Sequence, residues 1–164
     1  MADLLVHVGI AYPAVRALRD GRLRSLLYLG LCLPDLLYKG MLYGLGAATW
    51  LCEPTHSPLG LLPFCYLGAM LFERDWRARA FGAFWAGSLA HLVVDAGKDY
   101  LGSGALLWGF PFTMRAWEAG LYAPEETVLF MPFALAIILI TELVAGRRST
   151  SSGARPAPSS GRSC

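Results

Sequence analysis

A polar stripe interrupts the most apolar part of the chain and restricts how that part can fold. Ser88, His91, Asp95 and Asp99 recur every three or four positions, so they share one face if this segment is helical. They follow an apolar run at 80–87. Burying an imidazole and a carboxylate without partners costs several kcal/mol. We therefore expect the stripe to face a polar partner, a water-filled cavity or a metal ion.

The composition around this stripe indicates an integral membrane protein. Of the 164 residues, 55% are hydrophobic and only 16% are charged. The mean hydropathy is +0.47, which is too apolar for a soluble domain with one core. The four cysteines show no CxxC spacing, so we expect neither a disulfide framework nor a zinc ribbon. We expect an all-α, polytopic (multi-pass) membrane bundle.

Apolar segments divide the chain into candidate helices at 1–18, 25–50, 59–72, 80–97 and 127–145. The first is short and kinked at Pro13, and its first basic residue is Arg16, so it lacks the basic region of a cleaved signal peptide. Pro34 indicates a break in the second. The fourth would be about 27 Å long, which nearly matches a hydrocarbon core of about 30 Å. We expect about four membrane-crossing helices plus a short N-terminal helix.

The end of the chain divides into an irregular stretch, a membrane span and a tail. Residues 100–124 are rich in Gly, Trp, Phe and Pro and predict a structured interfacial loop. Pro124, Glu125 and Glu126 are typical of a helix start, and 127–145 is the cleanest span. We expect one membrane-embedded domain at 1–145. We expect the Arg/Ser/Pro-rich residues 146–164 to form a disordered tail.

The basic residues predict an orientation. Eleven of the fourteen lie in alternate connections and in the tail: Arg16, Arg19, Arg22, Arg24, Arg74, Arg77, Arg79, Arg147, Arg148, Arg155 and Arg162. By the positive-inside rule, these connections and the tail are cytoplasmic, and the loops after Trp50 and after Asp95 share the outer side. We expect a bacterial inner-membrane protein surrounded by lipids, with no nucleic-acid partner. The sequence identifies no protein partner.

Five side chains carry the chemistry that membrane depth makes costly: His7, Asp35, His56, His91 and Asp95. Imidazole and carboxylate are ligands of zinc and similar divalent ions. A set without a thiolate cage suits a catalytic ion that keeps a position open for water. Water bound to such an ion ionises near neutral pH and can act as a nucleophile.

Each candidate also has an ordinary interpretation when taken singly. His7 is most simply a core histidine. Asp35 and Lys39, four residues apart, could form a buried ion pair, and His56 could cap a helix or be solvated. Lys98 and Asp99 we expect to be interfacial and solvated. The case for a site depends on all three histidines of the chain and two aspartates converging.

Four motifs, in this order behind an early helix with a histidine, resemble those of the YdjM-like membrane-bound metal-dependent hydrolases. They are LPD at 33–35, THS at 55–57, AHLVVD at 90–95 and GSGALLWGFPF at 102–112. The resemblance covers 1–112 and implies a distant relation to the zinc-dependent phospholipase C and single-strand nuclease superfamily. It implies that His7, Asp35, His56, His91 and Asp95 occupy the metal-ligand positions.

The chain departs from that family pattern at three places. Leu36, Leu37 and Tyr38 stand where the family often has a second acidic or histidine position. Glu53 and Pro54 replace an HRG ahead of the THS, and Gly97 and Lys98 replace a Thr-Pro. Five donors could complete one site or serve two incomplete ones, and we expect one ion.

These inferences together predict a metal-dependent hydrolase in which metal-activated water attacks a phosphoester or similar ester, on a lipid-like substrate. We expect His56, His91 and Asp95 to hold a divalent ion, for which we favour zinc. Asp35 completes the shell or acts as general base, and His7 is a fifth donor or supports the ligands. Asp35 and His56 are the catalytic candidates.

Two alternatives from other classes stay open. In a proton- or ion-coupled transporter, Asp35, Lys39, His91 and Asp95 would form a relay that needs no metal. A non-catalytic membrane protein would instead recruit a partner through its tail. Bound metal separates the hydrolase from the relay, and deletion of 147–164 tests the tail.

Overall fold

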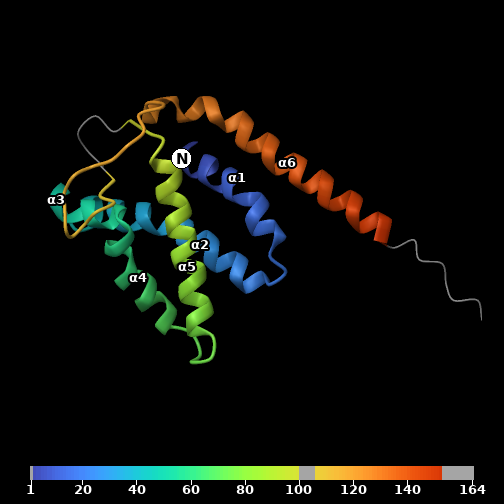
Figure 1. The fold of residues 1–164 in the computed structure, drawn as a ribbon, viewed down its shortest axis with the longest axis horizontal. Coiled ribbons are helices and arrows are strands. Elements are labelled where there is room, and N and C mark those ends of the chain that lie inside the picture. Colours follow the sequence, from blue (N-terminus) through green and yellow to red (C-terminus); the bar gives the residue numbers. More distant parts are fainter. Residues whose placement is uncertain (1, 100–105, 153–164) are drawn as a thin grey trace, which may run out of the picture.

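The computed structural model describes residues 2–99 and 106–152 (Figure 1). The described residues form six α-helices: α1 (Ala2–Ala17), α2 (Gly21–Lys39), α3 (Thr49–Cys52), α4 (Pro58–Met70), α5 (Arg77–Asp95) and α6 (Thr127–Ser152). Short turns of other helix types lie at η1 (Gly40–Gly44), η2 (Glu53–His56) and η3 (Pro124–Glu126). No strand occurs among these residues, only an isolated bridge between Lys98 and Tyr122. The all-α prediction is confirmed.

Helix α2 begins and continues for identifiable local reasons. The Asp20 side chain accepts a hydrogen bond from the backbone N–H of Arg22, which satisfies one donor of the first turn. The predicted break at Pro34 is wrong, because α2 passes through this residue and continues to Lys39. Proline removes one helical hydrogen bond, but neighbouring helices can satisfy the carbonyl that it releases.

Helices α2, α4 and α5 form the centre of the fold, with α2 crossing α5 (Figure 1). Helix α4 packs on α5 as well, and the buried cluster Leu61, Cys65, Leu92 and Leu106 joins them to the segment after residue 105. Helix α6 lies along α1 at the edge of the molecule (Figure 1). A Cβ on Gly9 of α1 would lie 2.5 Å from the Cβ of Ala134 in α6, so these two helices approach closely there.

The expected number of membrane-crossing helices is too high. Two helical stretches of the described chain, Gly21–Gly44 and Thr127–Arg147, are long and apolar enough to cross a membrane, fewer than the four expected. Helix α4 has 13 residues and would reach only about 20 Å. Helix α5 has 19 residues, but Arg77 and Arg79 at its start and His91 and Asp95 at its end interrupt its apolar character.

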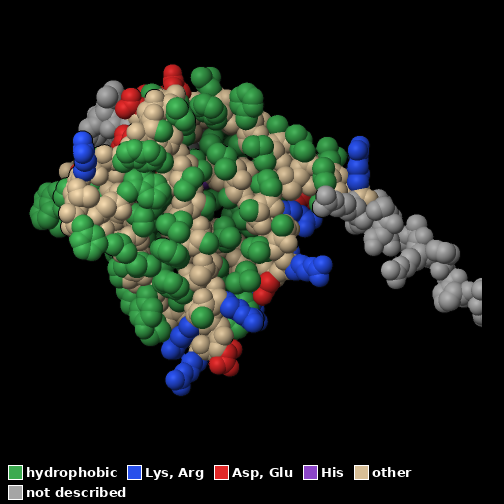
Figure 2. Space-filling model, in the orientation of Figure 1, with side chains coloured by type: hydrophobic (Ala, Val, Ile, Leu, Met, Phe, Trp, Pro, Cys, Tyr) green, Lys and Arg blue, Asp and Glu red, His purple; other side chains and the backbone are tan. Residues whose placement is uncertain are grey.

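The surface is largely apolar. Figure 2 shows hydrophobic side chains spread over the visible face, with most Lys and Arg side chains along its lower and right edges and another at its left edge. Exposed large apolar residues occur on every α-helix, for example Leu36 on α2 and Leu129 on α6.

Near its end the chain is helical further than expected. Helix α6 continues to Ser152, past the expected boundary at 145. Residues 153–164, which belong to the predicted disordered tail, lie outside the described residues, as do residues 100–105 of the predicted interfacial loop. The described part of that loop, 106–123, contains no helix. The short turn η3 and helix α6 follow this loop, at the place where Pro124, Glu125 and Glu126 predicted a helix start.

Candidate metal centre

Two glycines allow α2 and α5 to cross at very short distance. A Cβ on Gly30 would lie 2.2 Å from the carbonyl oxygen of Phe84, and one on Gly87 would lie 2.1 Å from that of Leu27. No side chain can be accommodated at these separations. Small residues are the usual means by which helices bring their backbones together. The next turn of α5, which carries His91, therefore reaches the backbone of α2.

Two backbone carbonyls of α2 accept hydrogen bonds from side chains of α5, and Pro34 leaves one of them without its helical donor. Proline has no N–H, so the carbonyl of Gly30, four residues earlier, lacks its helical donor. The Ser88 hydroxyl donates to that Gly30 oxygen at 3.0 Å. One turn on, Nδ1 of His91 lies 2.8 Å from the carbonyl oxygen of Leu31. A carbonyl can only accept, so Nδ1 carries a proton, and in the neutral tautomer of the ring Nε2 then presents a lone pair.

In the THS motif, a hydrogen-bond acceptor also lies next to Nδ1 of His56 and leaves Nε2 available. The Thr55 hydroxyl donates to the carbonyl oxygen of Cys52 at 2.7 Å, which leaves its oxygen as an acceptor 3.4 Å from Nδ1 of His56. Nε2 of His56 is thereby left as the nitrogen with the lone pair. Ser57 caps α4 by accepting from the N–H of Gly60 at 2.9 Å. His56 is buried and Ser57 is the cap, so the alternative interpretation of His56 as a helix cap or a solvated residue is wrong.

Four atoms from three parts of the chain converge on one small volume. Oδ2 of Asp95 lies 3.0 Å from Nε2 of His91 and 3.9 Å from Nε2 of His56. Oδ1 of Asp35 lies 3.8 Å from Nε2 of His56 and 4.0 Å from Nε2 of His91. Two donors bound tetrahedrally at about 2.0 Å from one ion would be about 3.3 Å apart. The observed separations lie on both sides of that value.

The arrangement leaves buried polar atoms without hydrogen bonds. Within the described chain, neither Nε2 of His91 nor Oδ2 of Asp95 has a hydrogen-bond partner, and both atoms are buried. Two lone pairs 3.0 Å apart repel each other unless a proton or a metal cation lies between them. The donors are nitrogen and oxygen atoms of the types that divalent transition metals bind. The residues present therefore fit a metal ion.

His7, on α1, contacts this group of converging side chains through Asp95. It is fully buried on α1, its Nε2 lies 2.9 Å from Oδ1 of Asp95, and its ring stacks on that of His91 with centroids 4.1 Å apart. Two overlapping groups have donor atoms within 4.8 Å of one another: His7, His91 and Asp95, and Asp35, His56 and His91. The structure thus brings together all five predicted site residues, and we call this group the centre. His7 contacts the oxygen of Asp95 that faces away from His56.

Both lysines of the chain contact the centre, and one of them was missed. Lys39 donates to Oδ2 of Asp35 at 2.5 Å, so the predicted pair forms, although it is partly exposed rather than buried. Lys98 donates to Oδ1 of Asp95 and is only 1% exposed, so the expectation that it is solvated is wrong. Asp99 is exposed, as expected, and lies beyond the end of α5. The missed signal is the spacing, because each lysine follows a candidate aspartate by three or four residues.

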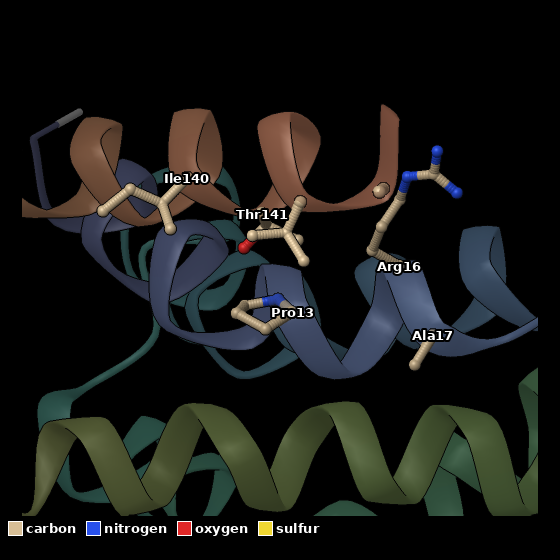
Figure 3. A pocket seen from close by; sticks show the side chains of 7 residues that line it. Pro13, Arg16, Ala17, Ile140 and Thr141 are labelled. Carbon is tan, nitrogen blue, oxygen red and sulfur yellow. The ribbon is translucent and has the colours of Figure 1, made fainter. Parts of the chain in front are cut away.

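The centre is reached from the side of Asp35. The side chain of Asp35 is 23% exposed, whereas His7, His56, His91 and Asp95 are all buried. A separate apolar groove of about 590 Å³ lies between α1 and α6, with Pro13, Arg16, Ile140 and Thr141 among the residues that line it (Figure 3). None of the five site residues lines this groove.

No family model, curated protein or solved structure matches this chain. The resemblance to the YdjM-like hydrolases stays a prediction from the motifs. A function must therefore be argued from the geometry of the centre.

Proposed function

We propose that this chain is a membrane-embedded, metal-dependent hydrolase of the YdjM-like type. The observation that carries the proposal is the convergence of Nε2 of His56, Nε2 of His91 and Oδ2 of Asp95, with Oδ1 of Asp35 beside them. Both histidines use Nδ1 for hydrogen bonds to α2 or η2, which is the arrangement that orients metal-ligating imidazoles.

The residues of the centre have different proposed roles. His56, His91 and Asp95 hold the ion, for which zinc is the best match to a small set of nitrogen and oxygen donors. A divalent ion held there would lower the pKa of bound water to about 7 and would so supply the nucleophile. Asp35 is the most exposed of the five residues, and its Oδ1 lies beside both histidines. Its Oδ1 would be the base that accepts the proton of such a water.

The membrane setting supports a lipid-like ester, such as a phosphoester, as the substrate class. The two apolar stretches that could cross a membrane have mostly exposed side chains, with 22% of the Gly21–Gly44 window and 6% of the Thr127–Arg147 window buried. Lipid-facing helices have this character, whereas the core helix of a soluble protein is mostly buried. Asp35 lies in the first stretch, so a lipid can reach it by lateral diffusion. We place the chain in the bacterial inner membrane with its tail in the cytoplasm.

The test is elemental analysis of the detergent-purified protein, with the variants His91→Ala, Asp95→Ala and Ser88→Ala purified in parallel. We expect about one zinc or similar ion per chain in the native protein and in Ser88→Ala. We expect its loss in the other two variants while helical content by circular dichroism is retained. Ser88 is the matched control, because it is buried on α5 but donates to Gly30 and not to the cluster. A native protein that binds no ion, even after incubation with Zn²⁺, would remove the hydrolase proposal.

A second candidate function rests on a different observation. His7, Asp95 and Lys98 form a buried chain of direct contacts through Oδ1 of Asp95. Such chains carry protons in ion-coupled transporters. A transporter would need no bound metal, and its activity in proteoliposomes would follow a pH gradient. The metal analysis therefore separates the two candidates directly.

A further inference from the structure

The two lysines of the chain bind the two carboxylates of the centre in the same way. Lys39 contacts Oδ2 of Asp35, while Oδ1 of that carboxylate faces His56 and His91. Lys98 contacts Oδ1 of Asp95, while Oδ2 faces the same two histidines. In each case one oxygen is held by an ammonium group, and only the other oxygen is directed at the converging donors.

We propose that Lys39 and Lys98 are positioning residues that restrict Asp35 and Asp95 to one donor oxygen each, and thereby make the centre selective for a four-coordinate ion such as Zn²⁺ over Ca²⁺. This inference rests on the proposed metal centre and goes beyond it, because it assigns a function to two residues outside the ligand set. The lysines act through the carboxylates and are not catalytic residues.

The selectivity follows from what each ion requires. Zn²⁺ is satisfied by about four donors at about 2.0 Å, and a carboxylate that binds through one oxygen serves it fully. Ca²⁺ takes about six to eight oxygen ligands and commonly uses both oxygens of a carboxylate. With one oxygen of each aspartate held by a lysine, the centre offers the ion one carboxylate oxygen of Asp95 and two imidazoles, and only one oxygen of Asp35 lies beside them. That set is too small, and too rich in nitrogen, for Ca²⁺.

The two lysines differ in burial, so their replacement has different effects on the fold. Lys98 is 1% exposed beside Asp95, which His7 also contacts, so removing its ammonium group affects the interior of the fold. Lys39 is 57% exposed on the last turn of α2, so its replacement leaves the interior unchanged. Lys39→Met is therefore the primary variant, and Lys98→Met is the second.

The experiment measures the affinities for Zn²⁺ and for Ca²⁺ separately, with the metal ions alone as probes, in detergent-purified protein. The readout is the ratio of the two affinities. Loss of a positive charge raises the affinity for any divalent cation by a similar factor, and this factor cancels in the ratio. Arg115→Met is the matched control, since it removes one charge from an exposed residue of the loop after residue 105.

We expect the native protein and Arg115→Met to prefer Zn²⁺ strongly. We expect the Zn²⁺ to Ca²⁺ ratio to fall at least about tenfold in Lys39→Met, the usual size of effect for a residue that orients a ligand. Lys98→Met should shift the ratio in the same direction if its circular dichroism spectrum stays native. Zinc binding with an unchanged ratio in Lys39→Met would overturn the inference and leave the proposed function intact. Failure of the native protein to bind Zn²⁺ would overturn both.

Discussion

The close crossing of α2 and α5 is the part of the fold on which the centre depends most, and Gly87→Ala tests it. A Cβ at this position would lie 2.1 Å from the carbonyl oxygen of Leu27 and 2.8 Å from the backbone N of Leu31. Ordinary contact begins at 3.4 Å, so the two backbones must separate by about 1 Å or more. Overpacking of this kind costs about 1–3 kcal/mol.

The same displacement acts on the centre four residues further along α5. Nδ1 of His91 lies 2.8 Å from the carbonyl oxygen of Leu31, and a separation of about 1 Å would lengthen this contact beyond hydrogen-bonding distance. Loss of a hydrogen bond that orients a ligand lowers metal affinity by about 10–100-fold. We expect Gly87→Ala to weaken Zn²⁺ binding by that factor, although no ligand is changed.

The assay combines thermal unfolding in detergent with a Zn²⁺ competition titration, and Gly82→Ala is its control. Gly82 also lies on α5, but a Cβ there would meet nothing within 4 Å. Alanine at this open position should stabilise the helix by up to about 1 kcal/mol and leave zinc affinity unchanged. If Gly87→Ala unfolded no earlier than Gly82→Ala and bound zinc equally well, the tight crossing would not be what positions His91.

Two further predictions concern His56 and the orientation in the membrane. Thr55→Val keeps the side-chain shape but removes the oxygen 3.4 Å from Nδ1 of His56, so zinc affinity should fall about tenfold, whereas Thr55→Ser should retain it. Equal affinities in the two variants would exclude the threonine as the group that orients His56. In a cysteine-free background, a membrane-impermeant maleimide added to intact cells should label Leu45→Cys but not Arg155→Cys. The reverse pattern would invert the proposed topology.

Residue type and helical spacing were sufficient to predict which polar side chains come together, but not how they meet. Imidazoles and carboxylates in apolar surroundings need partners, so His91 and Asp95 could be identified from the sequence. The contact between α2 and α5 depends on Gly30 and Gly87, which belong to separate apolar runs without a distinctive period. Periodicity describes one helix at a time, so it could not show which backbone His91 would reach.

The sequence overestimated the membrane spans because apolar runs were counted without regard to where the helices end. The run at 59–72 was expected to cross, yet α4 ends at Met70 after 13 residues. The burial of Lys98 was missed for a related reason. A lysine next to Asp99 at the end of a helix is usually solvated, and only the folded chain shows that Asp95 and His7 lie within reach of it.

The motifs gain a physical meaning from the structure that their letters did not carry. In LPD, Pro34 leaves a carbonyl of α2 without its helical donor, where Ser88 of α5 can bind, and Asp35 supplies an oxygen to the centre one residue later. In THS, Thr55 orients the imidazole of His56, and the following serine begins α4. In each motif, a candidate donor thus stands next to a residue that shapes the local hydrogen bonding. A substitution at Thr55 should therefore alter the centre through geometry and leave its ligand set intact.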